Sequence, residues 1–110
     1  MITTHVLDTA TGQPAQGVTV ILEMRQSSDW SPIGRGVTGA DGRLTTLTGH
    51  PMLPGTYRLT FDTGEYHRDR GIAMPFFPEV MITFTVRDVS EDFHVPLLLS
   101  PYGYSTYRGS

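Results

Sequence analysis

Apolar and polar residues alternate along most of this chain, which is typical of half-buried β-strands. The alternation is clearest over residues 18–25, where only Ile21 interrupts it, and segments 57–62 and 80–87 repeat the pattern. Valine, threonine and tyrosine, which favour strands, are frequent in these segments. We therefore predict eight short strands, over residues 3–8, 18–25, 30–38, 44–47, 57–62, 80–87, 93–99 and 104–108.

The segments between these strands carry turn signals and leave little room for helix. The chain has 12 glycines and 8 prolines, and the Asp41-Gly42 pair is a turn signal of its own. A short helix is predicted only over residues 64–71, with Thr63 as its cap, because the prolines of segment 74–78 cannot continue it. Eight strands and one short helix predict an all-β sandwich, and 110 residues without a linker predict a single domain over residues 1–110.

The predicted strand 93–99 has two apolar faces. Its odd-numbered positions are all apolar, and its even-numbered positions are His94, Pro96 and Leu98. A strand exposed to water on one face would have one polar face. The second face is therefore covered, either by another copy of the chain in a symmetric oligomer or by a loop of the same chain.

Composition excludes several classes of function. The net charge is −3 with scattered basic residues, so we expect no nucleic-acid partner. No apolar run is long enough to span a membrane, and residues 1–5 lack the features of a signal peptide, so we expect a cytoplasmic protein. The absence of cysteine excludes disulfides and thiolate metal sites. All 8 basic residues are arginine, which excludes lysine chemistry.

Two of the four histidines, His5 and His94, lie within predicted strands. A histidine can donate and accept protons near neutral pH, although a single strand histidine is more often structural. His50 and His67 are predicted to lie on the surface. A metal site would need a third ligand, and Asp8 has the opposite parity from His5 on its strand, so we expect no metal.

Two further segments carry groups suited to polar recognition. Arg43 follows the Asp41-Gly42 turn, where its guanidinium could bind an anion or polarise a carbonyl, or could simply be exposed. Residues 102–108 are rich in tyrosine, threonine and serine, followed by Gly109 and Ser110. This segment can pair into a sheet and line a pocket, although an edge strand with a loose tail is the commoner outcome.

Together these residues resemble a known family. The stretches are Thr4-His-Val-Leu-Asp8, Thr38-Gly-Ala-Asp-Gly-Arg43, His94-Val-Pro-Leu-Leu-Leu-Ser-Pro101 and Tyr107-Arg-Gly-Ser110. They resemble the 5-hydroxyisourate hydrolases, the transthyretin-related enzymes of purine breakdown, over essentially the whole chain. Phe93 stands where that family often has tyrosine, which is a conservative difference.

The resemblance implies a transthyretin-like (prealbumin-like) eight-stranded Greek-key sandwich that forms a homotetramer, a dimer of dimers, with active sites in the channel between dimers. It implies a small purine-derived substrate, 5-hydroxyisourate, and neither a metal nor an organic cofactor. By position in the motifs, it implies His5, Arg43, His94 and Ser110 as catalytic residues, and Arg43, Tyr107, Arg108, Gly109 and Ser110 as substrate-binding residues.

Two alternatives to an enzyme remain open from the sequence. One is a transthyretin-like carrier that binds a small ligand in the channel without catalysis, and the other is a structural sandwich module of a larger protein. For the enzyme, the resemblance implies hydrolysis of the N1–C6 amide, with His5 orienting or deprotonating water. His94 would relay or donate a proton to the leaving nitrogen, and Arg43 would stabilise the oxyanion.

Overall fold

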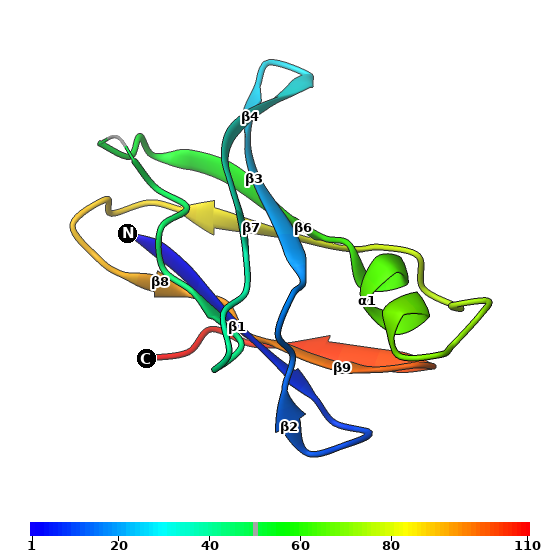
Figure 1. Cartoon of the computed structure of the whole chain (residues 1–110). Helices are drawn as coiled ribbons and strands as arrows, with labels where there is room; N and C mark the ends of the chain where they lie inside the picture. The colour runs from blue at the N-terminus through cyan, green and yellow to red at the C-terminus, as the bar shows by residue number, and fades with distance from the viewer. Residues whose placement is uncertain (50) are drawn as a thin grey trace.

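The computed structural model describes residues 1–49 and 51–110, so the surface position predicted for His50 lies outside the described residues. It contains two β-sheets and one helix (Figure 1). The strands are β1 (Ile2–Asp8), β2 (Gln13–Pro14), β3 (Thr19–Gln26), β4 (Asp29–Val37), β5 (Arg43–Leu44), β6 (Gly55–Phe61), β7 (Val80–Val86), β8 (Phe93–His94), β9 (Leu97–Ser100) and β10 (Gly103–Thr106), and the helix is α1 (Thr63–Asp69).

Strand β1 organises the first sheet. The order in that sheet is β10-β9-β1-β2, and β5 and β8 also pair with β1. β8 and β9 run parallel to β1, whereas β2 and β5 are antiparallel to it. The second sheet is antiparallel throughout, with the order β4-β3-β6-β7. The first strand of the chain therefore lies beside segments from its last quarter.

The core lies between the two sheets. Along β1, the side chains of Ile2, Thr4, Val6 and Asp8 are buried, while the intervening side chains are half-buried on the outer face. β3 and β6 contribute buried apolar residues to the same core by the same alternation. This period-two pattern, which the sequence already showed, decides which side chains of β1 face the core and which face outward.

The predicted all-β sandwich is confirmed, with differences in individual elements. The predicted strand 93–99 is divided into β8 and β9, because Pro96 has no N–H group for a continuous ladder. The predicted strand 44–47 is wrong: β5 covers only Arg43 and Leu44. Between the first two predicted strands lies the additional two-residue strand β2, so the described residues form ten strand segments rather than eight.

The helix is present, but its predicted cap is wrong. The N-cap is Asp62, whose carboxylate accepts a hydrogen bond of 3.1 Å from the backbone N–H of Glu65. The hydroxyl of Thr63 is buried and donates to the carbonyl of Phe77 at 2.7 Å. α1 lies at the opposite end of the molecule from the two termini (Figure 1). α1 has seven residues, and no helix of the described residues is long and apolar enough to span a membrane.

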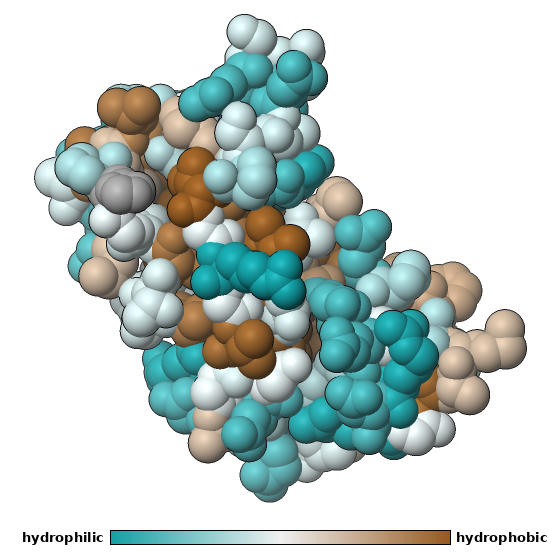
Figure 2. Space-filling model, turned by 45° about the horizontal axis from the view of Figure 1, so that its top comes forward, coloured by the Kyte–Doolittle hydropathy of each residue, from teal (hydrophilic) through white to brown (hydrophobic). Residues whose placement is uncertain are grey.

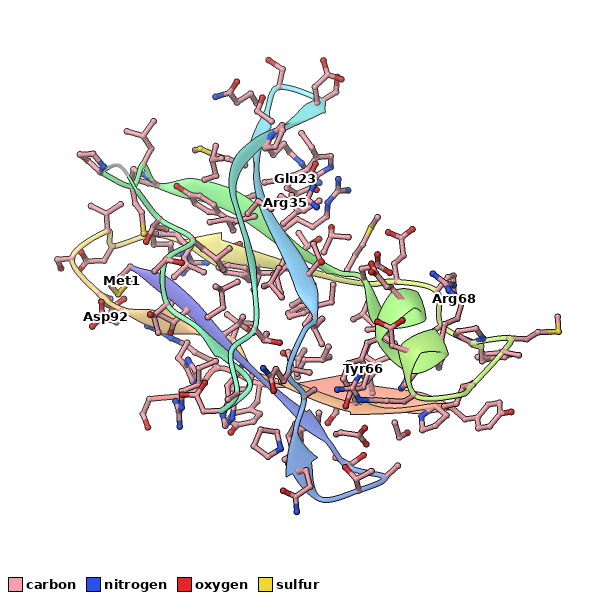
Figure 3. The ribbon with its side chains drawn as sticks, viewed as in Figure 1. Met1, Glu23, Arg35, Tyr66, Arg68 and Asp92 are labelled. Atoms are coloured by element: carbon pink, nitrogen blue, oxygen red, sulfur yellow. The ribbon has the colours of Figure 1, made fainter. Side chains whose placement is uncertain are left out.

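The surface position predicted for His67 is also wrong. Its side chain is 2% exposed, and neither ring nitrogen has a hydrogen-bond partner among the described residues. Neighbouring Tyr66 points from α1 toward the first sheet (Figure 3), where its hydroxyl donates to the buried carboxylate of Asp8 at 2.8 Å. Burial, followed by the bond to Asp8, raises the pKa of Tyr66 to about 12.

Burial lowers the pKa of His67, an effect that the charge of Asp8 opposes and that of Arg70 reinforces. The helix is thus joined to β1 by the buried Tyr66–Asp8 hydrogen bond, and the buried imidazole of His67 stays neutral. Elsewhere on the surface, apolar areas are interrupted by hydrophilic side chains on the face shown in Figure 2.

Candidate active site

Strand register brings the two strand histidines and Arg43 to one face of one sheet. His5 on β1 lies directly opposite Arg43 on β5 in an antiparallel pair. Two residues earlier, Thr3 lies opposite His94 on β8 in a parallel pair. Because Thr3 and His5 both alternate outward from the core, the three groups gather on the outer face of the first sheet. Arg43 lies 38 positions after His5 in the chain and His94 lies 89 positions after it, yet both meet His5 around a single strand.

A tight turn places Arg43 beside β1. The carboxylate of Asp41 accepts a 3.0 Å hydrogen bond from the backbone N–H of Arg43, and its other oxygen lies 3.9 Å from the guanidinium. Gly42 has φ +76°, and a β-carbon there would lie 2.4 Å from the carbonyl oxygen of Val6 and 3.2 Å from the ring of His5. Only glycine fits this position. The side chain of Arg43 remains 53% exposed, so it is free to contact a ligand.

His94 is held from two sides. Its Nδ1 atom lies 2.8 Å from the hydroxyl oxygen of Thr3. On the other side, the backbone N–H of Gly109 donates to the carbonyl of His94 at 2.7 Å, forming an isolated β-bridge. A β-carbon at Gly109 would lie 2.6 Å from the imidazole. The backbone of the C-terminal segment therefore packs directly against the ring.

The electrostatic environment keeps His94 neutral. Burial, the positive charge of Arg43 and the proximity of His5 all lower the pKa of His94, in that order of importance. The site therefore combines one permanent cation with a neutral imidazole at physiological pH. Such a set can bind a planar, electron-rich molecule and exchange protons with it. Among the described residues, no group of three histidine or carboxylate side chains is placed to hold a metal ion.

Two of the other expected site residues, Tyr107 and Arg108, lie elsewhere within the protomer. Tyr107 and Arg108 line a cavity of about 250 Å³ together with side chains of β7. The guanidinium of Arg108 stacks 4.6 Å from the ring centre of Phe93 and lies 3.6 Å from the carboxylate of Glu91. Ser110 follows Gly109 and is exposed. A single protomer thus gathers His5, Arg43, His94 and Gly109, but leaves Tyr107 and Arg108 outside that group.

The sequence reasoning missed Thr3 as a member of this site. Its hydroxyl is the hydrogen-bond partner of the His94 ring, and its strand pairing fixes the position of β8. A signal was present, because Thr3 has the same parity as His5 on a predicted strand. The contact itself depends on the parallel pairing of β1 with β8, which local pattern does not reveal.

The fold and this site define the transthyretin-like class of β-sandwiches. The sequence model of the HIUase/Transthyretin family matches residues 2–109. The chain belongs to the HIUase/Transthyretin family. It is 44% identical over 111 residues to the 5-hydroxyisourate hydrolase of Salmonella dublin, which covers 100% of this chain and 81% of the relative.

Solved structures show that both branches of the family share this backbone. The Klebsiella pneumoniae 5-hydroxyisourate hydrolase superposes with a TM-score of 0.87 at 38% identity, covering 99% of this chain and 98% of that one. Sea bream transthyretin, solved in complex with thyroxine, gives a TM-score of 0.91 at 30% identity, covering 98% and 93%. Backbone shape therefore does not distinguish the hydrolase from transthyretin. The distinction has to come from the side chains of the site.

Proposed function

We propose that this protein hydrolyses 5-hydroxyisourate. The observation that carries the proposal is the gathering of His5, Arg43 and His94 on the outer face of the first sheet by the pairing of β1 with β5 and β8. Relatives that share 44% of its residues over the whole chain are named as enzymes with this activity. The chain is accordingly a hydrolase acting on a small molecule.

The reaction that suits these groups is opening of the six-membered ring at the N1–C6 amide, giving 2-oxo-4-hydroxy-4-carboxy-5-ureidoimidazoline. His5 orients or deprotonates the attacking water. His94 relays a proton or donates one to the leaving nitrogen. Arg43 holds the planar substrate and stabilises the oxyanion, a role in which one lost donor costs about 3 kcal/mol. General acid–base assistance contributes about 10² to 10⁴-fold.

The site is proposed to be complete only in a homotetramer, a dimer of dimers. β7 and β10 are edge strands of the two sheets, and an unpaired edge is a template for pairing with another chain. Phe76 and Tyr102 are large aromatic side chains that are 65% and 81% exposed in the protomer. In the proposed tetramer, Tyr107, Arg108 and Ser110 would lie near a histidine pair of a neighbouring copy.

The proposal includes one transthyretin-like domain over residues 1–110, a cytoplasmic location, and catalysis by side chains without a metal or organic cofactor. The rival function is a carrier that binds a small ligand on the same face. The face carries Arg43 opposite His5, with His94 nearby. These polar side chains favour the hydrolase, because an apolar ligand would offer them no hydrogen bonds.

The decisive experiment follows the ultraviolet decay of freshly generated 5-hydroxyisourate with and without the protein. We expect strong acceleration over spontaneous decay. The variants His5→Ala, Arg43→Ala and His94→Ala are each expected to lose about 10² to 10⁴-fold in kcat/KM. Light scattering should still show four times the 12.2 kDa protomer mass for each variant.

Arg35→Ala is the matched control, because Arg35 is a cation on β4 in the other sheet (Figure 3). It should hydrolyse the substrate at the rate of the unmodified protein. If the unmodified protein does not accelerate the decay of 5-hydroxyisourate, the carrier function is the better proposal. A near-normal rate in one of the three alanine variants would remove that residue from the mechanism.

A further inference from the structure

The contact between Thr3 and His94 joins the first strand to the candidate catalytic ring. The hydroxyl oxygen of Thr3 lies 2.8 Å from Nδ1 of His94, across a part-buried pair separated by 91 residues in the chain. The backbone carbonyl of Thr3 also accepts the N–H of Val95 at 2.9 Å. Because the backbone and side chain of Thr3 both hold this segment, the orientation of the imidazole is fixed by strand register.

The chemical nature of this partner distinguishes it from the usual one. The Nδ1 atom of a functional histidine commonly donates to a carbonyl or carboxylate oxygen, which can only accept and therefore keeps the proton on Nδ1. A threonine hydroxyl can also donate. With a neutral ring, donation by Thr3 to Nδ1 requires the ring proton to be on Nε2.

The surroundings of the ring favour this arrangement. Burial, the guanidinium of Arg43 from β5 and the ring of His5 from β1 all favour the neutral form of His94. A neutral imidazole has one nitrogen lone pair available to accept a bond. Among the contacts of the described residues, His94 is the hydrogen-bond partner of the Thr3 hydroxyl. That hydroxyl proton is best satisfied by Nδ1.

We propose that Thr3 is a positioning residue whose hydroxyl donates to Nδ1 of His94 and so keeps the ring proton on Nε2. The consequence for catalysis rests on the proposed function. A neutral imidazole with its proton on Nε2 is a hydrogen-bond donor beside the cation of Arg43. Neutral imidazoles with lowered pKa values serve as such donors in enzymes. His94 would thereby present a proton to the substrate while His5 handles the water.

The direct test is a nitrogen-15 NMR titration of the histidine rings in the assembled protein without substrate, with His94→Gln used to assign the signals. In the unmodified protein we expect the tautomer with the proton on Nε2. Thr3→Val keeps the size and branching of the side chain but removes the hydroxyl. A bond donated to Nδ1 stabilises only the neutral ring, so its loss should raise the pKa of His94. Thr3→Ser should keep both tautomer and pKa.

If Thr3 instead accepted a bond from Nδ1, the unmodified protein would show the proton on Nδ1, and Thr3→Val would lower the pKa of His94 or leave it unchanged. The tautomer of the unmodified protein decides the question by itself if Thr3→Val does not fold.

A neighbouring threonine provides the matched control. The hydroxyl of Thr4 donates to the carbonyl of Val95 at 2.7 Å, so it also links β1 to the chain after β8, but it faces the core. Thr4→Val should lower thermal stability without moving the pKa or tautomer of His94. Thr3→Val should change the pKa and tautomer of His94 without lowering thermal stability. Equal titration shifts in both variants would reduce Thr3 to a structural role.

Kinetics complete the test. Thr3→Val should reduce kcat/KM about tenfold or more, as does loss of the outer hydrogen-bond partner of metal-bound histidines, and Thr3→Ser should restore it. The acid limb of the pH–rate profile should move to higher pH in Thr3→Val only. If the unmodified protein fails to hydrolyse 5-hydroxyisourate, the proposed function fails, but the titration still decides the role of Thr3.

Discussion

A glycine packs against each of the two histidines of the candidate site. Gly42 approaches the ring of His5, and Gly109 approaches the ring of His94. In both places a β-carbon would lie closer to a neighbouring atom than van der Waals contact allows. The two backbone segments can therefore act as flat walls beside the imidazoles, which limits how far either ring can turn.

Gly109→Ala tests this wall at the residue scale. The added methyl group would lie 2.6 Å from the imidazole of His94, so the ring or the C-terminal segment has to move. We expect hydrolysis to fall at least tenfold, since small displacements of a reacting group cost about that much or more. The midpoint of thermal unfolding should change little, because residues 107–110 contribute no side chain to the buried core.

Gly103→Ala is the control for this prediction. It lies on β10 in the same C-terminal segment, and its nearest neighbour would be the hydroxyl of Ser100 at 3.6 Å, an ordinary contact. Its activity should match that of the unmodified protein. If Gly109→Ala were equally active, contact with the His94 ring would not matter for turnover.

Residue types and predicted elements singled out part of the candidate site. His5, His94 and Arg43 could be selected because two strand histidines and a turn arginine are suited to proton transfer and anion binding. The structure brings them together through β1. Thr3 shares the parity of His5, but parity alone does not single it out, because threonine is common in strands for its shape. Its importance comes from a partner 91 residues away.

At the scale of elements, α1 depends on the first sheet for its stability. A seven-residue helix is too short to be stable alone in water. Its buried face contacts the sandwich, and the hydroxyl of Tyr66 reaches the carboxylate of Asp8. The other oxygen of Asp8 accepts the backbone N–H groups of Ala10 and Thr11. One buried carboxylate thus joins the helix to the turn that follows β1.

Tyr66→Phe should therefore destabilise the protein measurably. The substitution keeps the ring but leaves a buried carboxylate oxygen without its donor, which costs about 1–3 kcal/mol. Chemical denaturation followed by circular dichroism measures the loss. Ser28→Ala removes an exposed hydroxyl from the turn between β3 and β4 and should be neutral. A Tyr66→Phe variant as stable as Ser28→Ala would show that water replaces the lost donor.

The same helix shows where element prediction from sequence stops. Period-two alternation located the long strands, and the prolines of segment 74–78 correctly limited the helix. The burial of His67 was missed, although Thr63, Tyr66 and His67 have the spacing of one helical face. With only two turns, that pattern is too short to show which face is buried until the sheet beneath it is known.

At the scale of the whole molecule, the buried imidazole of His67 makes stability depend on pH. Burial lowers its pKa in the folded state, whereas the unfolded chain takes up a proton near the ordinary value of about 6.5. Below that pH the unfolded state binds more protons than the folded state, so the free energy of unfolding decreases as the pH falls. We expect the midpoint temperature of thermal unfolding to decrease once the pH falls below about 6.5.

His67→Phe provides the comparison. Phenylalanine fills a similar volume without a titrating group, so the drop in midpoint should become shallower. It should not vanish, because the pKa of His94 is lowered as well and contributes with the same sign. An unchanged slope in His67→Phe would assign the acid sensitivity to other groups. Differential scanning calorimetry at several pH values provides the measurement.

The parallel pairing of β1 with β8 and β9 also has a consequence for the time course of folding. β1 precedes the other strands, and its parallel partners lie about ninety residues further along the chain. Contacts between such distant segments form slowly, because a long loop has to close before they stabilise anything. The strands of the second sheet lie closer to one another in the chain, so that sheet can form earlier. His5 and His94 then meet only when the last strands arrive, so catalytic competence should be the final property that a newly made chain acquires.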